Sequence, residues 1–164
     1  TIETKIKFSR KPSGLSQHSG VIAYQDDDNY LMLVYGAGAR FRGQSGNQSG
    51  SVYLISEENG NMKTIETINL EADFLNNNSI YFKLEKVGET YSASYSADNK
   101  TFKNAGSTKI LLRDLNAGII ACEGIPDPRM AFFMNMRNEG KKETAESPLE
   151  VSVDYFHINN RGIK

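Results

Sequence analysis

Apolar and polar residues alternate in short runs along the whole chain, and this period of two is the feature that most constrains its fold. In the first run, Ile2, Ile6 and Phe8 alternate with lysine and glutamate, which is typical of a strand with one buried and one wet face. No run has the spacing of a convincing helix, and residues 70–75 are the one stretch that we expect to form a helical turn. The pattern therefore predicts an all-β protein.

Turn-forming residues separate these runs at close intervals. Asp26–Asn29 contains turn-formers only, and Glu58–Asn61 has Asn-Gly at its tip, so each segment predicts a hairpin between its neighbouring runs. The predicted strands are 2–8, 21–25, 30–35, 52–57, 62–70, 80–85, 91–96, 109–112, 118–122, 131–136 and 150–158. About eleven or twelve short strands with such turns favour a two-sheet antiparallel β-sandwich, a jelly roll, with a barrel as the alternative.

Length and charge exclude several classes of protein. A chain of 164 residues suits one domain, which we place over residues 1–164. Nineteen basic against twenty acidic residues argue against a nucleic-acid partner, and no apolar run approaches the roughly 20 residues of a membrane span. A single cysteine excludes an intramolecular disulfide and a thiolate-rich zinc site. Because the chain begins without methionine or a leader, we expect it to be part of a larger multidomain protein.

The residue patterns that would support catalysis are not found. Glycoside hydrolysis needs two carboxylates facing each other across a bond, and no predicted strand offers such a pair on an obvious cleft face. Glu57 and Glu58 are sequential acids at a turn and should diverge. Neither His18 nor His157 belongs to a nucleophile-elbow pattern, and Cys122 follows an apolar run that predicts a small buried residue. We therefore predict that the chain is not an enzyme.

Two predicted strands, 30–35 and 52–55, are apolar on both faces. Such a strand is either central and covered twice, or keeps one face for a ligand. Aromatic rings can stack on the apolar faces of sugars while polar neighbours bind the hydroxyls. A ligand patch where the long loop 36–50 leaves the sheet would take stacking from Tyr35, Phe41 and Tyr53 and hydrogen bonds from Gln25, Arg40 and Arg42. The alternative is that the Arg-Phe-Arg triplet belongs to a plain solvated loop.

One acidic residue suggests a metal site. Asp154 shares a predicted strand face with Phe156 and Ile158, both of which look core-facing. A carboxylate in that position must be hydrogen-bonded or metal-bound to offset its desolvation. Glu3 approaches it if the terminal strands pair, and calcium prefers such oxygen ligands. Asp154 and Glu3 are therefore our candidate ligands for a structural calcium ion.

Several segments, taken in order, resemble the concanavalin A-like, laminin-G-like domains of bacterial carbohydrate-active enzymes. The segments are Glu3–Lys5, Gly20–Tyr30, Tyr81–Phe102, Ala117–Ala121 and Val153–Ile158. The resemblance is strongest to the C-terminal domains of β-xylosidases and arabinofuranosidases. Asn99 and Phe102 stand where that family has glycine and tryptophan, and the segments 36–50 and 126–148 are longer than expected.

The resemblance implies two curved antiparallel sheets, a non-catalytic role and an extracellular location, secreted or at the cell surface. We therefore predict a carbohydrate-binding module for a polysaccharide or its oligosaccharides, appended to the catalytic domain of a secreted glycoside hydrolase. A first alternative is an accessory domain that packs on the catalytic domain without binding sugar, for which 132–136 is a candidate apolar patch. A second alternative is a glycoside hydrolase or lyase in its own right, which would need convergent acids on the concave face.

Overall fold

The computed structural model describes residues 1–12, 17–37, 50–71, 78–122 and 148–159, which form ten strands and no helix. The strands are β1 (Ile2–Phe8), β2 (His18–Asp26), β3 (Asn29–Gly36), β4 (Ser51–Glu58), β5 (Asn61–Asn69), β6 (Ser79–Val87), β7 (Thr90–Ser96), β8 (Lys103–Lys109), β9 (Asn116–Cys122) and β10 (Val151–Ile158). Within these residues, nothing helical is long and apolar enough to cross a membrane.

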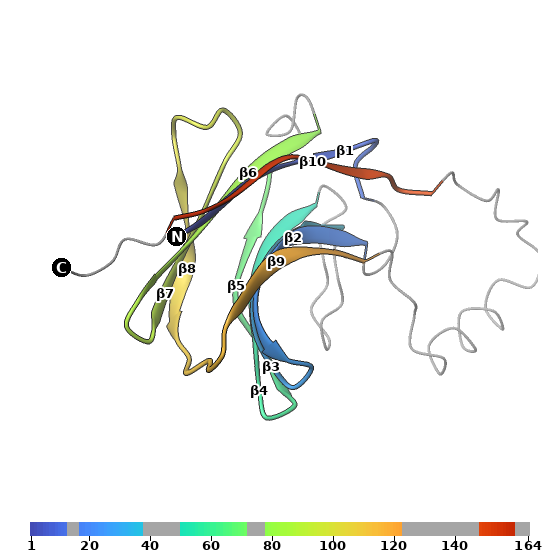
Figure 1. Ribbon diagram of the computed structural model, residues 1–164. Coiled ribbons are helices and arrows are strands. Elements are labelled where there is room, and N and C mark those ends of the chain that lie inside the picture. Colours follow the sequence, from blue (N-terminus) through green and yellow to red (C-terminus); the bar gives the residue numbers. More distant parts are fainter. Residues whose placement is uncertain (13–16, 38–49, 72–77, 123–147, 160–164) are drawn as a thin grey trace, which may run out of the picture.

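The strands form two antiparallel sheets that face each other (Figure 1). The first sheet has the order β10-β1-β6-β7-β8, and the second has the order β5-β4-β3-β2-β9. In the first sheet, β1 lies between β10 and β6, with Ile2 opposite both Ile158 and Leu84. The two-sheet antiparallel β-sandwich predicted from the alternation is confirmed.

Alternate residues of both sheets meet in one core between them. In β1, Ile6 and Phe8 are buried, and in β3 the same holds for Leu33 and Tyr35. The rings of Phe8 and Tyr35 join the two sheets edge to face, with centroids 5.3 Å apart and planes at 77°. In β1 and β3 the inward half of the alternating pattern is therefore buried, as its spacing predicts. Ile158 of β10 was also expected to face the core, but it lies near the end of its strand and is 58% exposed.

The second sheet also carries a buried apolar cluster on its other face. This outer cluster consists of Met32, Val34, Tyr53 and Ile55, none of them more than 3% exposed. These residues belong to β3 and β4, the two strands that the sequence shows to be apolar on both faces. Of the two interpretations of such strands, their burial favours central strands covered on both faces.

The two predicted hairpins are present, and their tips are joined. Asn59 and Gly60 have φ angles of 52° and 71°, the left-handed geometry that Asn-Gly adopts readily in a two-residue hairpin turn. The N–H of Gly60 donates to the carbonyl oxygen of Asp28 at 3.1 Å, and the N–H of Asn59 donates to Oδ1 of Asn29 at 3.0 Å. The β2–β3 and β4–β5 turns therefore hold each other in place.

The prediction of a strand over 109–112 is wrong, because the strand in this region is β8, Lys103–Lys109. Ile110 and Leu112 are buried but follow the strand, and Ala105 is the only buried residue within β8. A strand with one small inward side chain has almost no alternation to detect. The expected strand 131–136, the loop 38–49, the segment 126–147 and most of the expected helical turn lie outside the described residues.

Candidate functional site

The predicted sugar-binding patch is not assembled by the described strands. The register of β3 and β4 pairs Tyr35 with Val52 and Val34 with Tyr53. Because successive side chains of a strand point to opposite faces, Tyr35 and Tyr53 lie on opposite faces of the second sheet. Tyr35 is fully buried in the central core, and Tyr53 is 2% exposed in the outer cluster. The expectation that these two rings share one ligand surface is therefore corrected.

The remaining residues of the predicted patch do not form a ligand surface with either ring among the described residues. Gln25 is occupied at the end of β2, where its Nε2 donates to Oδ2 of Asp26 at 2.9 Å and its Oε1 accepts from the N–H of Arg113 at 2.7 Å. Arg40, Phe41 and Arg42 lie outside the described residues, so their role in binding stays a prediction.

Asp154 faces away from the core, contrary to the expectation from its spacing. The pairing of β1 with β10 shifts register between Lys5 and Ile6, so that Lys5 lies opposite Tyr155 and Ile6 lies opposite Val153. Asp154 is the extra residue of this β-bulge, and the bulge reverses the alternation of inward and outward side chains. Its carboxylate oxygen lies 2.5 Å from Nζ of Lys5.

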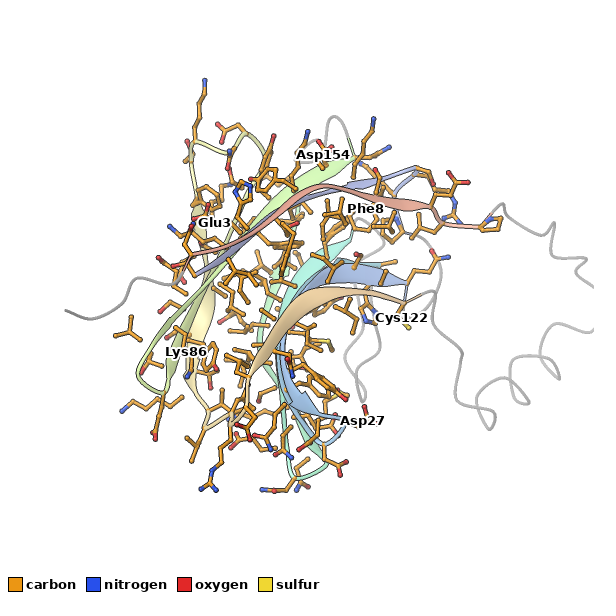
Figure 2. The ribbon with its side chains drawn as sticks, in the orientation of Figure 1. Glu3, Phe8, Asp27, Lys86, Cys122 and Asp154 are labelled. Carbon is orange, nitrogen blue, oxygen red and sulfur yellow. The ribbon has the colours of Figure 1, made fainter. Side chains whose placement is uncertain are left out.

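Glu3 is likewise engaged by a lysine. It lies opposite Lys83 in the register of β1 and β6, with 3.5 Å between the carboxylate oxygen and Nζ. Figure 2 shows Glu3 and Asp154 on the outer side of the first sheet, with Phe8 between the sheets. Among the described residues, no three histidine, cysteine, aspartate or glutamate side chains gather as a metal site would require. Calcium binding by Asp154 and Glu3 stays a prediction, now with a lysine beside each carboxylate.

The side chains considered for catalysis are also dispersed. Oε2 of Glu57 accepts a hydrogen bond from the hydroxyl of Tyr30 at 2.6 Å, while Glu58 is exposed at the turn. Cys122 is exposed at the end of the edge strand β9, which corrects the expectation that it is buried. His18 is buried in β2, and His157 is exposed in β10.

The outer side of the first sheet carries a row of side chains that the sequence analysis did not single out. Across β6, β1 and β10, Lys5 lies opposite both Tyr81 and Tyr155. Nζ of Lys5 lies 5.7 Å from the ring centroid of Tyr81, and the rings of Tyr155 and His157 lie 4.8 Å apart at 33°. We call Lys5, Tyr81, Tyr155 and His157 the ring face.

The ring face combines half-exposed rings with paired charges. Asp154 accepts a hydrogen bond from Lys5 and holds the pKa of that ammonium above its usual value. Burial, followed by the neighbouring Tyr81 and Glu3, raises the pKa of Tyr155, so its hydroxyl is a neutral donor at physiological pH. The two tyrosines stand on strands two spacings apart, about 10 Å. This geometry suits an extended ligand with apolar faces and hydroxyl groups.

Two sheets in this order, with the first and last strands paired, define a concanavalin A-like β-sandwich. The model of the β-xylosidase C-terminal concanavalin A-like domain matches residues 1–118. The chain belongs to this family and is therefore an accessory domain of the kind that glycoside hydrolases carry. No curated protein sequence matches the chain.

Solved structures share the fold at low sequence identity. A mutant of the GH43 protein BlXynB from Bacillus licheniformis is 18% identical with a TM-score of 0.62, over 94% of this chain and 26% of that one. A functionally unknown protein from Saccharomyces cerevisiae is 16% identical with a TM-score of 0.58, over 74% of this chain and 58% of that one. A xylan β-1,4-xylosidase from Bacillus halodurans is 14% identical with a TM-score of 0.53, over 72% of this chain and 23% of that one. The chain thus spans about a quarter of the length of the two bacterial proteins.

Proposed function

We propose that this chain is a non-catalytic module that binds a polysaccharide through the ring face and serves the catalytic domain of a glycoside hydrolase. Its family membership supports the accessory role. The observation that carries the proposal is the row of Tyr81, Lys5 and Tyr155 across three neighbouring strands, flanked by His157. Tyrosine rings supply apolar stacking surface and hydroxyl groups, while the lysine supplies donors for sugar oxygens.

Xylan is the first ligand to test, because one structure of similar fold is named as a xylan β-1,4-xylosidase. Sugar units that stack on Tyr81 and Tyr155 would lie about 10 Å apart, so an oligosaccharide of several units should bind more tightly than a monosaccharide. The proposal therefore predicts a dependence on chain length as well as on sugar type.

The test is calorimetric titration of the chain with xylohexaose and xylose. We expect Tyr81→Ala and Tyr155→Ala each to raise the Kd for xylohexaose by about three- to tenfold, the loss of one aromatic contact. Tyr24→Ala is the matched control, because Tyr24 is a partly buried tyrosine at the end of a strand in the other sheet. Unchanged affinity in both ring-face variants would overturn the site, and no binding to any of a panel of plant and bacterial polysaccharides would overturn the function.

A second candidate function is packing on a catalytic domain of the same polypeptide without sugar binding. Leu111 and Leu115, 57% and 37% exposed in the connection between β8 and β9, favour it as uncovered apolar side chains. Added catalytic domain of a GH43 xylosidase should then co-elute with the chain in gel filtration, and Leu111→Ser should weaken that association. If the wild type and Leu111→Ser associate with the catalytic domain equally well, the connection between β8 and β9 has no role in packing.

A further inference from the structure

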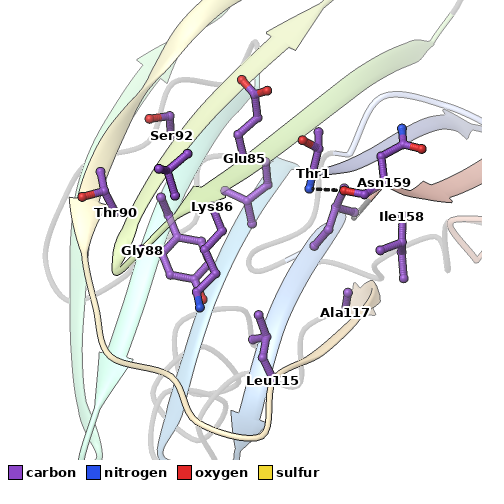
Figure 3. Close-up of a pocket in the computed structure, with 14 residues that line it drawn as sticks. Thr1, Glu85, Lys86, Gly88, Thr90, Ser92, Leu115, Ala117, Ile158 and Asn159 are labelled. Atoms are coloured by element: carbon purple, nitrogen blue, oxygen red, sulfur yellow. Dashed lines mark hydrogen bonds between the residues drawn. The ribbon is translucent and has the colours of Figure 1, made fainter. Parts of the chain in front are cut away.

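A groove of about 830 Å³ opens at one end of the sandwich, between the β6–β7 hairpin and the start of β9 (Figure 3). Its volume lies in the range of small-molecule binding sites. Its apolar lining consists of Ile2, Leu84, Val87, Leu115, Ala117 and Ile158. The groove includes no residue of the ring face, so an inference about it goes beyond the proposed function.

The apolar lining has a buried floor and an exposed rim. Ile2 and Leu84 are 7% and 2% exposed, whereas Val87, Ile158 and Leu115 are 76%, 58% and 37% exposed. A ligand that covers exposed aliphatic side chains around a recess removes their apolar surface from water, which is favourable. The rim therefore favours a ligand with an apolar body.

The groove also contains a hydrogen-bond donor that lacks an acceptor. Tyr91 is 1% exposed, and its buried hydroxyl has no hydrogen-bond partner among the described residues. Burial raises the pKa of Tyr91 to about 12, so the hydroxyl keeps its proton at physiological pH. A buried polar group without a partner costs free energy, which a ligand that accepts from it would recover.

Lys86 places a positive charge beside Tyr91 in the groove. Nζ of Lys86 lies 5.7 Å from the ring centroid of Tyr91, and no carboxylate of the described chain forms an ion pair with it. Glu85 also lines the groove, and its carboxylate lies 3.4 Å from Nζ of Lys83. Lys86 is exposed and its side chain is flexible, so it can swing aside to admit a ligand to the Tyr91 ring.

We propose that this groove binds a small amphipathic carboxylate, with an aliphatic or aromatic body and one anionic end. The body lies over Leu115, Ala117 and Ile158, and the carboxylate accepts from Lys86 and Tyr91. The unpartnered Tyr91 hydroxyl and the Lys86 ammonium, beside an apolar rim, favour a ligand with both an anionic end and an apolar body. A neutral alcohol lacks the charge, and acetate lacks the body.

The test is titration of the chain with octanoate, followed by calorimetry and by amide chemical shifts. We expect saturable binding to octanoate, with octan-1-ol and acetate each at least about tenfold weaker. Lys86→Gln should raise the Kd for octanoate about tenfold, since a hydrogen bond to a charged group is lost, and Tyr91→Phe should raise it about threefold. Lys63→Gln, an exposed lysine on β5, is the charge-matched control and should leave the Kd unchanged.

One further variant and one further measurement keep the proposal open to refutation. Ala117→Phe should fill the groove and abolish octanoate binding while both donors remain. Tyr91→Phe should be as stable as the wild type or more so, because it removes a buried hydroxyl that has no partner. Equal octanoate affinity in Lys86→Gln and Lys63→Gln, chemical shifts confined to residues outside the groove, or a clear loss of stability in Tyr91→Phe would each overturn the assignment.

Discussion

The outer faces of the two sheets differ although their strands share one alternating period. On the second sheet, the outer cluster of Met32, Val34, Tyr53 and Ile55 is as buried as the central core. On the first sheet, the corresponding face carries ion pairs and half-exposed rings. Alternation identifies which residues of a strand face the core. Whether the opposite face of the sheet is packed or exposed depends on which residues occupy the outward-facing positions of the strand.

The largest expected difference between the two faces is in packing energy. Ile55→Ala should lower the free energy of unfolding by about 2–5 kcal/mol, because it leaves a cavity in a fully buried cluster. Tyr155→Ala, on the ring face, should cost less, about 1 kcal/mol, because the Tyr155 side chain is only partly buried. Urea unfolding of both variants measures the comparison. Similar costs for the two substitutions would show that the faces do not differ in this way.

A smaller difference is expected from the tyrosine hydroxyls. The hydroxyl of Tyr30, beside the outer cluster, donates to the Glu57 carboxylate at 2.6 Å. Tyr30→Phe should therefore lower the free energy of unfolding by about 1–2 kcal/mol, less than a fully buried charged hydrogen bond because Tyr30 is only partly buried. Tyr155→Phe is the matched change on the ring face and should cost less than about 0.5 kcal/mol. The prediction fails if Tyr155→Phe is the more destabilising of the two.

The smallest expected effect is the part of the alkaline pH dependence of stability that Lys5 of the ring face contributes. Asp154 raises the pKa of Lys5 in the folded chain above the ordinary 10.5. Stability from the charged lysine is therefore fully present below about pH 10.5 and is lost as the pH rises through the raised value. Between pH 9 and 12, the wild-type Tm should fall slightly more than that of Lys5→Met, and less so in high salt. Lys63→Met, an exposed lysine of the other sheet, should follow the wild type.

The sandwich could be predicted from the sequence because most strands carry one strongly apolar set of positions. Ile6 and Phe8, or Leu31 and Leu33, identify their inward face without any knowledge of the partner strand. The strand β8 could not be found in this way, since Ala105 is its only buried residue. Its position depends on pairing with β7, and pairing is a property of two strands rather than one.

The candidate site was harder to predict for the same reason. Whether Tyr35 and Tyr53 share a face depends on the register of β3 with β4, which neither strand's own pattern contains. The outward position of Tyr81 follows from its place between Ile80 and Phe82 in an alternating run. That of Asp154 does not follow from the sequence, because the bulge beside Lys5 shifts the alternation by one residue. Site prediction therefore failed where it needed relations between strands.

The pairing of the first strand with the last has a consequence for how the chain folds. Because β1 lies between β6 and β10, both of its partner strands come from distant parts of the chain. During synthesis, one edge of β1 stays open until residues 151–158 have left the ribosome. Contacts this distant in sequence make closure of the first sheet slow, on the order of milliseconds to seconds. A nascent chain that stops before β10 would present that open edge as a template for aggregation.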